Sequence, residues 1–179
     1  MRVSCKIVAL FALVCVLPVS MVAQGKGVPG KRDWHAATPA ELAAVLPARA
    51  QVEKEHIETE MPTATGVIDS HGRVVAAVVL ITAGYAANGK YYYYLLAQAP
   101  IRIGEDITLQ PGTYAIGWTR ATDGLLVHVY EAETGVPRGT VTAHPINQPL
   151  PIVPVKIWPP EERSVIQIGR FALPYSLEP

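Results

Sequence analysis

The sequence predicts a mainly β protein, an antiparallel β-sandwich or barrel of about 8–9 strands with a short N-terminal helical segment. The first observation is that short runs rich in valine, isoleucine and tyrosine recur along the chain after Met61-Pro62. The second is that glycine, proline, asparagine and aspartate separate these runs, as they do in tight turns. The third is that the connections are short, which favours antiparallel neighbours in a sheet.

Residues 1–23 have the order of a cleavable secretory signal peptide. Arg2 and Lys6 supply a short positive region, the stretch 7–17 is apolar and uncharged, and small residues lead up to Ala23. A membrane-spanning helix needs about 20 apolar residues, and this stretch is about half that long. We therefore expect cleavage after Ala23, a secreted or periplasmic protein, and no stable membrane span once the signal has been removed.

Cleavage would remove both cysteines, Cys5 and Cys15, and leave 156 of the 179 residues. The remaining chain would then hold no thiol nucleophile, no cysteine zinc site and no disulfide framework. The signal carries two of the 15 basic residues and none of the 15 acidic ones, so the net charge becomes −2. A near-neutral chain without a basic stripe argues against nucleic acid as a partner.

The remaining residues divide into three regions. Residues 24–37 combine glycines with basic residues and are predicted to be a flexible leader, with Trp34 available to dock on the domain. Residues 38–60 are predicted to be a helical segment. Residues 63–179 are predicted to be the β-domain, and their number suits one fold with its own core.

The helical segment has a clear start in the sequence. Thr38 can cap a helix, a proline follows at the first helical position, and Glu41 completes a capping box. Pro47 should end or kink this helix, because proline lacks the N–H and clashes with the preceding turn. One or two further helical turns are expected over 48–56.

Turn signals divide the β-domain into strands. Asn88-Gly89 favours the positive φ angles of a tight hairpin turn. Pro111-Gly112 is expected to turn one strand directly into the next, and residues 145–154 form a proline-rich loop. The strands are predicted at 73–82, 91–97, 101–103, 107–109, 113–120, 125–132, 139–143, 155–158 and 165–173.

Four consecutive tyrosines, at positions 91–94, are the most unusual feature of the sequence. Successive side chains of a strand point to opposite faces, so two should face inward and two outward. Tyrosine suits both a half-buried strand and an exposed platform for a sugar or peptide. Tyr92 and Tyr94 are the candidates for a ligand-binding role, and simple core packing is the alternative.

The predicted strand 125–132 alternates clearly between two faces. Leu125, Val127 and Val129 form one face, which we expect to lie in the core. His128 and Tyr130 lie on the other face, beside the threonines of the returning strand. That face is a candidate surface for a small ligand, and it is also compatible with an ordinary solvated sheet face.

No motif for catalysis or metal binding is recognised. The five histidines show no His-x-x-x-His, His-Glu-x-x-His or His-x-His spacing, and no serine lies in Gly-x-Ser-x-Gly. Trp118 shares the strand face of Tyr114 and Ile116 and is predicted to lie in the core. No cofactor is predicted.

The segment 107–116 contains Leu-Gln-Pro-Gly-Thr-Tyr. It resembles the Leu-x-Pro-Gly-x-Tyr hairpin of transthyretin-like and carboxypeptidase-regulatory-like sandwiches. The resemblance implies an accessory or binding module on an exported protein. It covers ten residues of the 179, and no family is assigned from it.

These observations predict an exported, non-catalytic β-domain that binds a small molecule, a glycan or a protein partner. One alternative is a structural or assembly protein of the cell envelope, which would self-associate through an exposed strand edge or apolar patch. A second alternative is a hydrolase with an unrecognised site. Its candidate residues would be Asp69, His71, Glu105 and His128.

Overall fold

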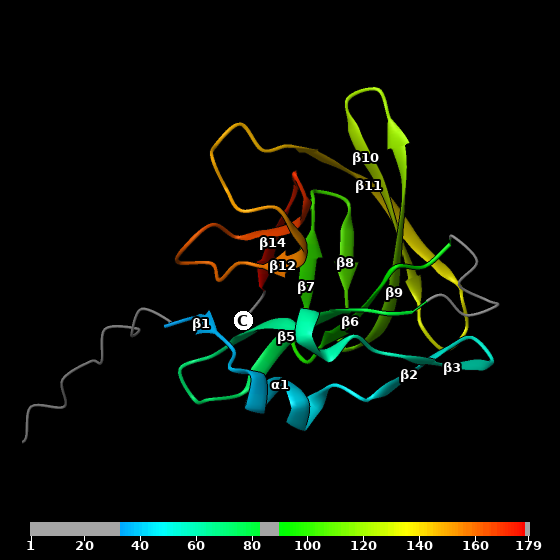
Figure 1. Ribbon diagram of the computed structural model, residues 1–179, viewed down its shortest axis with the longest axis vertical. Coiled ribbons are helices and arrows are strands. Elements are labelled where there is room, and N and C mark those ends of the chain that lie inside the picture. Colours follow the sequence, from blue (N-terminus) through cyan, green and yellow to red (C-terminus); the bar gives the residue numbers. More distant parts are fainter. Residues whose placement is uncertain (1–32, 83–89, 178–179) are drawn as a thin grey trace, which may run out of the picture. The chain divides into compact units, whose positions relative to one another are not determined.

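The computed structural model describes residues 33–82 and 90–177 (Figure 1). The predicted signal peptide, most of the leader and the Asn88-Gly89 turn lie outside the described residues. The described elements are β1 (His35–Ala36), α1 (Pro39–Val45), β2 (Arg49–Val52), β3 (Glu55–Glu58), the 3-10 helix η1 (Met61–Thr63), β4 (Thr65–Ile68), β5 (Val74–Leu80), β6 (Tyr93–Ala97), β7 (Ile101–Ile103), β8 (Ile107–Leu109), β9 (Gly112–Ala121), β10 (Gly124–Glu131), β11 (Pro137–Pro145), β12 (Val153–Ile157), β13 (Val165–Gly169) and β14 (Phe171–Leu177).

The prediction of a mainly β, antiparallel fold is confirmed. Twelve strands form one sheet, whose main path runs β1-β4-β5-β6-β9-β10-β11-β14-β13-β12, with the β7–β8 hairpin attached to β14 through β7. β2 and β3 form a separate two-stranded sheet. Among the described residues no strand pairing joins the two ends of the path, so the sheet is not a closed barrel. β12 packs across β4 and β5 instead, where the Ile157 N–H donates to the Thr65 hydroxyl at 3.0 Å.

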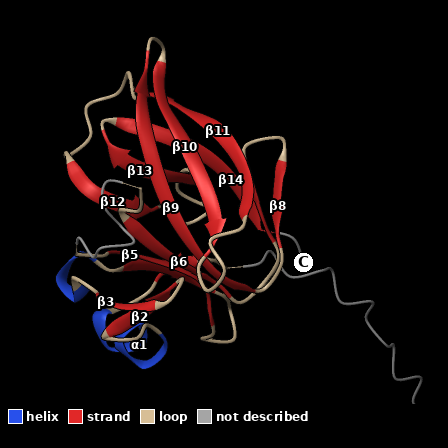
Figure 2. Cartoon of the chain, turned by 90° about the vertical axis from the view of Figure 1, so that its right-hand side faces the viewer, coloured by secondary structure: helices blue, strands red, loops and turns tan. Residues whose placement is uncertain are grey.

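The sheet buries apolar residues on two sides. The first core lies between the two halves of the folded sheet, and the second lies between β4, β5, β6 and β9 and the layer of α1, β2 and β3 (Figure 2). β5 is buried on both faces, which explains its continuous apolar run. Fully buried residues of the first core include Leu95, Ile116, Val127, Ile166 and Leu173, and those of the second include Ala50, Val52, Val79 and Ala115.

The predicted helix start is confirmed, but the second half of the helical segment is not a helix. Thr38 is the N-cap of α1 and forms a capping box with Glu41, and the helix ends before Pro47. Residues 49–58 form the β2–β3 hairpin, in which Glu53 adopts a φ of +54° at the turn. The expected helical turns over 48–56 are therefore wrong. The alternating burial of β2 shows that its apolar residues have a period of two and face the second core.

The end of the predicted flexible leader is ordered. His35 and Ala36 pair with β4, and the Ala37 N–H donates to the Gly66 carbonyl at 2.9 Å. Trp34 packs against the first core, as expected for a docking side chain. These contacts place the boundary of the folded domain before His35 rather than after residue 37.

The Pro111-Gly112 turn is not the centre of a hairpin. β8 pairs with β7, whereas β9 pairs with β6 and β10, so the turn carries the chain from one part of the sheet to another. The Leu-Gln-Pro-Gly-Thr-Tyr segment therefore does not form the hairpin that its resemblance implies.

The predicted strand 165–173 is in fact two strands, β13 and β14, joined at Gly169-Arg170. That division, together with β1, β2, β3 and β4, explains why more strands are found than predicted.

Candidate functional site

The four tyrosines at 91–94 are divided between the two cores. Tyr91 and Tyr94 belong to the second core, and Tyr93 belongs to the first. Tyr92 packs against the first core, with its ring stacked on Trp118 at a centroid distance of 5.0 Å. Tyr94 is 6 % exposed and presents no platform to solvent. The structure thus separates Tyr92 from Tyr94, which the sequence had grouped as candidates.

His128 and Tyr130 lie on the outer face of β10, and the opposite face lies in the core as predicted. The His128 ring nitrogens lie 3.4 Å from the Thr119 hydroxyl and 3.1 Å from the Thr140 hydroxyl. The Tyr130 ring meets the Tyr91 ring edge-on at 5.2 Å. These contacts tie the outer face to neighbouring strands, and a ligand-binding role for it stays a prediction.

A polar cluster of Glu53, Lys90 and Tyr91 covers part of this outer face. The Glu53 carboxylate accepts hydrogen bonds from the Tyr91 hydroxyl and, at 3.0 Å, from the Lys90 ammonium. The Tyr91 and Lys90 bonds lower the pKa of Glu53, while Tyr91 and Glu53 raise the pKa of Lys90. Burial raises the pKa of Tyr91, and the bond to Glu53 adds to that rise. Each group is held in its ordinary charge state, so none is prepared to move a proton near neutral pH.

A cavity of about 420 Å³ lies beside the Pro111-Gly112 turn. Part of its polar lining is already engaged in hydrogen bonds within the protein. Glu131 accepts from both Arg138 and Thr134, and the Tyr114 hydroxyl donates to the Gln110 carbonyl at 2.7 Å. Of its three charged side chains, Glu131 and Arg138 are therefore paired with each other, which leaves them less available to a ligand, and Glu133 is the third.

A second cavity, of about 360 Å³, lies between the β9–β10 hairpin and the β13–β14 hairpin. We call it the binding cavity. It is lined by apolar side chains and two arginines, and its lining residues include no aspartate or glutamate. Its lining residues are Tyr93, Trp118, Arg120, Leu125, Ile152, Pro154, Ile168, Gly169, Arg170 and Phe171.

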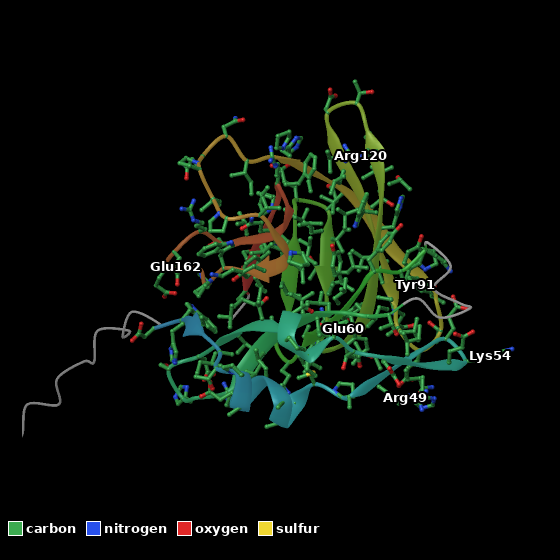
Figure 3. The ribbon with its side chains drawn as sticks, in the orientation of Figure 1. Arg49, Lys54, Glu60, Tyr91, Arg120 and Glu162 are labelled. Carbon is green, nitrogen blue, oxygen red and sulfur yellow. The ribbon has the colours of Figure 1, made fainter. Side chains whose placement is uncertain are left out.

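β9 and β10 supply one wall of the binding cavity. Trp118 and Arg120 continue the inward-facing row of β9, because residues two apart in a strand share a face. Arg120 is paired across the ladder with Leu125, which is buried in the first core. Arg120 itself is exposed, near the free end of the β9–β10 hairpin (Figure 3). This wall therefore changes from apolar to cationic at its rim.

The turn between β13 and β14 supplies the other cationic group. Ile168 and Phe171 are the last ladder pair, so Gly169 and Arg170 form a two-residue turn. Gly169 has a φ of +59°, which the first central position of a type II′ turn requires. The turn leaves the Arg170 side chain exposed at the rim. Among the described residues, no hydrogen bond or ion pair engages the guanidinium of either Arg120 or Arg170.

Aromatic side chains stiffen the floor of the binding cavity. The Tyr93 hydroxyl donates to the Pro154 carbonyl at 3.0 Å, which links β6 to β12. Burial raises the pKa of Tyr93, and the adjacent Trp118 side chain opposes part of that rise. The Trp118 indole N–H is buried, and it has no hydrogen-bond acceptor among the described residues. The floor is thus aromatic and carries one unsatisfied donor.

Gln167 holds the two sides of the cavity mouth together. Its side-chain amide donates to the Pro151 carbonyl at 2.8 Å and to the Gly169 carbonyl at 2.9 Å. Its side-chain carbonyl accepts from the Trp158 indole at 2.9 Å. The side chain is 1 % exposed. It therefore fixes the loop that presents Ile152 and the turn that presents Arg170 in one arrangement.

Of the four candidates for a hydrolase, Asp69 and His71 lie together, with the His71 Nδ1 at 3.8 Å from the Asp69 carboxylate, and Glu105 and His128 belong to other elements. Asp69 lies in the β4–β5 turn, Glu105 in the β7–β8 turn and His128 on the outer face of β10. The Asp69 carboxylate accepts from the Arg73 guanidinium at 2.7 Å and from the backbone N–H of His71 at 2.9 Å. Burial alone would raise the pKa of Asp69, but these hydrogen bonds outweigh it and lower the pKa to about 2. Asp69 is thus a fixed carboxylate that stabilises a turn.

The described residues contain no group of three or more metal-binding side chains that could hold an ion. Nor do they contain a helix with the length and apolar character needed to cross a membrane. Comparison of the chain with protein-family models, with curated proteins and with solved structures finds no match.

Sequence reasoning missed both arginines of the binding cavity. Arg120 could have been found by extending the two-residue period of Tyr114, Ile116 and Trp118 by one step. Arg170 has no such local signal, because its place depends on how β13 and β14 pair and on which strands lie beside them. Trp118 was expected in the core, and the structure places it partly there and partly in the cavity wall.

Proposed function

We propose that the protein is an exported, non-catalytic domain that binds a small molecule in the binding cavity. The observation that carries this proposal is the combination of a cavity of about 360 Å³ with an apolar lining and few polar groups. Cavities of roughly 300–1,000 Å³ with this character are the usual sites for small ligands. The volume lies at the low end of that range, so the ligand is small.

The charge states of the described polar clusters support a binding role rather than a catalytic one. Glu53, Lys90 and Tyr91 have pKa values displaced away from neutrality, as does Asp69. A general acid or base works best with a pKa close to the working pH. Within the binding cavity, the lining residues include no carboxylate, histidine or serine that could act as base or nucleophile.

Export is supported by the amino-acid sequence. The first 23 residues have the charge and hydropathy order of a cleavable signal, and they contain both cysteines. A domain that leaves the cytoplasm in this way would depend on its apolar cores and hydrogen bonds for stability, without disulfides.

The proposal is tested with an uncharged fluorescent probe, N-phenylnaphthylamine, titrated into the purified protein. Saturable binding with increased probe emission is expected. Ile152, which is 63 % exposed, lines the cavity, whereas Val136, which is 47 % exposed, lies in the β10–β11 turn. Ile152→Ser should weaken probe binding at least threefold, because about 1 kcal/mol of apolar contact is lost.

Val136→Ser is the matched control, since it also removes an exposed apolar side chain. It should leave the probe affinity unchanged within twofold. Loss of affinity in both variants, or in neither, would contradict the assignment of the ligand to this cavity. Energy transfer from tryptophan to the bound probe gives a second readout, which Trp118→Phe should reduce more than Trp34→Phe.

A further inference from the structure

We propose that the ligand of the binding cavity is a small amphipathic anion. Its apolar body would lie on the floor beside Trp118, and its acidic head, a carboxylate or sulfonate, would bind between Arg120 and Arg170. This inference rests on the proposed function and adds the chemical class of the ligand.

The charge of the cavity carries the first part of the argument. Its lining contains two cationic side chains and no anionic one, although the whole chain has equal numbers of basic and acidic residues. In the described residues neither guanidinium has a protein partner. Elsewhere in the structure arginines do find carboxylates, as Arg73 does with Asp69 and Arg138 with Glu131. The cavity rim therefore carries positive charge that no side chain of the described residues pairs with, and an anionic ligand could balance it.

The placement of the two arginines carries the second part. Arg120 projects from the end of β9, and Arg170 projects from the tight turn between β13 and β14. The two elements form different walls of one cavity. A guanidinium presents a planar fork of donors that matches the geometry of a carboxylate or sulfonate. Two such forks at one rim favour an anionic head over a neutral one.

The floor below the rim defines the rest of the ligand. Leu125 and Ile168 are buried side chains of the first core, and Phe171 packs against the same core. Trp118 adds an aromatic face that is held in place by its stacking on Tyr92. An apolar group placed here would be stabilised because its surface is removed from water. A wholly polar anion such as phosphate would gain contacts with the arginines alone. The structure thus favours a molecule with an apolar body and one acidic end.

The test compares two probes that differ in a single group. Anilinonaphthalene sulfonate is N-phenylnaphthylamine with one added sulfonate, so the pair isolates the contribution of the anionic head. In wild-type protein at low salt both probes should bind. Arg120→Gln and Arg170→Gln should each weaken the anionic probe by about fivefold, the upper range for an exposed ion pair, and the neutral probe by less than twofold.

Arg49→Gln is the matched control. Arg49 is exposed on β2, at the opposite end of the view from Arg120 in Figure 3, and it does not line the cavity. This variant loses the same positive charge and should change the affinity of neither probe. High salt should reduce the effect of the arginine variants on the anionic probe, because exposed charges are screened.

The outcomes separate the two proposals. If the neutral probe binds and responds to Ile152→Ser, but the arginine variants do not weaken the anionic probe, the ligand class is wrong and the binding cavity stands. Equal weakening of the anionic probe by Arg49→Gln would also overturn the ligand class, because net charge would then explain the effect. If neither probe binds, the proposed function itself is wrong.

Discussion

Replacing Gln167 by leucine should destabilise the protein and open the cavity mouth. In the described residues Gln167 and Asp69 are the two polar side chains that are buried. All three hydrogen-bonding contacts of the Gln167 amide go to groups on other segments or at the neighbouring turn. Leucine has a similar size but neither accepts nor donates. The substitution therefore removes the bonds while leaving most of the packing intact.

The loss in unfolding free energy can be worked out from the three groups that hydrogen-bond to the Gln167 side chain. The Trp158 indole N–H and the carbonyls of Pro151 and Gly169 each lose a bond of 2.8–2.9 Å. A hydrogen bond lost in this way costs about 1 kcal/mol when its partner can reach water, and up to about 3 kcal/mol when it cannot. Pro151 is exposed, and Trp158 and Gly169 are partly exposed, so the lower value applies to each. The expected loss is about 3 kcal/mol, or about 10 °C in melting temperature.

Urea unfolding followed by circular dichroism measures this loss directly. Gln148→Leu is the matched control, because Gln148 is exposed and makes one surface bond, to Arg163 at 2.8 Å. It should change the free energy of unfolding by less than about 0.5 kcal/mol. Near-equal stabilities of the two variants would refute the reasoning. Gln167→Leu should also weaken binding of N-phenylnaphthylamine, since Ile152 and Arg170 are no longer held in one arrangement.

Three further substitutions test other parts of the fold. Asp69→Asn should lower stability by up to about 2 kcal/mol at neutral pH. The depressed pKa of Asp69 stabilises the wild type above about pH 4, and that contribution is lost as the pH falls toward 2, so the two proteins should converge in acid-unfolding curves. Gly117→Ala should cost about 1–3 kcal/mol in urea unfolding, because a Cβ there would overlap the backbone carbonyl of Lys90. Gly112→Ala should cost less, because a Cβ there would meet its nearest atoms, in the Tyr114 side chain, at 3.5 Å. Thr38→Ala should cost about 1 kcal/mol by the same assay, because it removes the N-cap of α1.

The strands that could be predicted are those with a clear period and clear turns. β9 and β10 were expected within two residues of their observed ends, because alternating apolar residues and the Thr-Asp-Gly turn define them locally. The hairpin β2–β3 was not expected. Its residues include glutamates and a lysine that suit a helix, and its strand period depends on only three buried positions, Ala50, Val52 and Ile57. The packing of those three side chains against the second core overrides local propensity.

Local sequence patterns could not predict which strands pair when the strands are distant in sequence. The residues around Pro111-Gly112 do not indicate that β8 pairs with the preceding strand β7 while β9 pairs with β6. The tyrosine run illustrates the same limit, because a strict period would place Tyr92 and Tyr94 on one face. Tyr91 and Tyr92 precede β6, so the alternation begins at Tyr93 and the two candidates separate.

The binding cavity exists because the β9–β10 hairpin extends beyond β6, the strand that pairs with β9 (Figure 1). β6 pairs with β9 from Gly112 to Ile116, so the last residues of β9 lack a β6 partner among the described residues. On the other side, β11 passes from β10 to β14, and Pro145 pairs with Phe171 beside the Gly169-Arg170 turn. Two hairpin ends therefore meet around space that neither neighbouring strand fills, and each end contributes one arginine. A cavity built in this way depends on strand lengths and pairing order, which explains why its cationic rim has no motif in the amino-acid sequence.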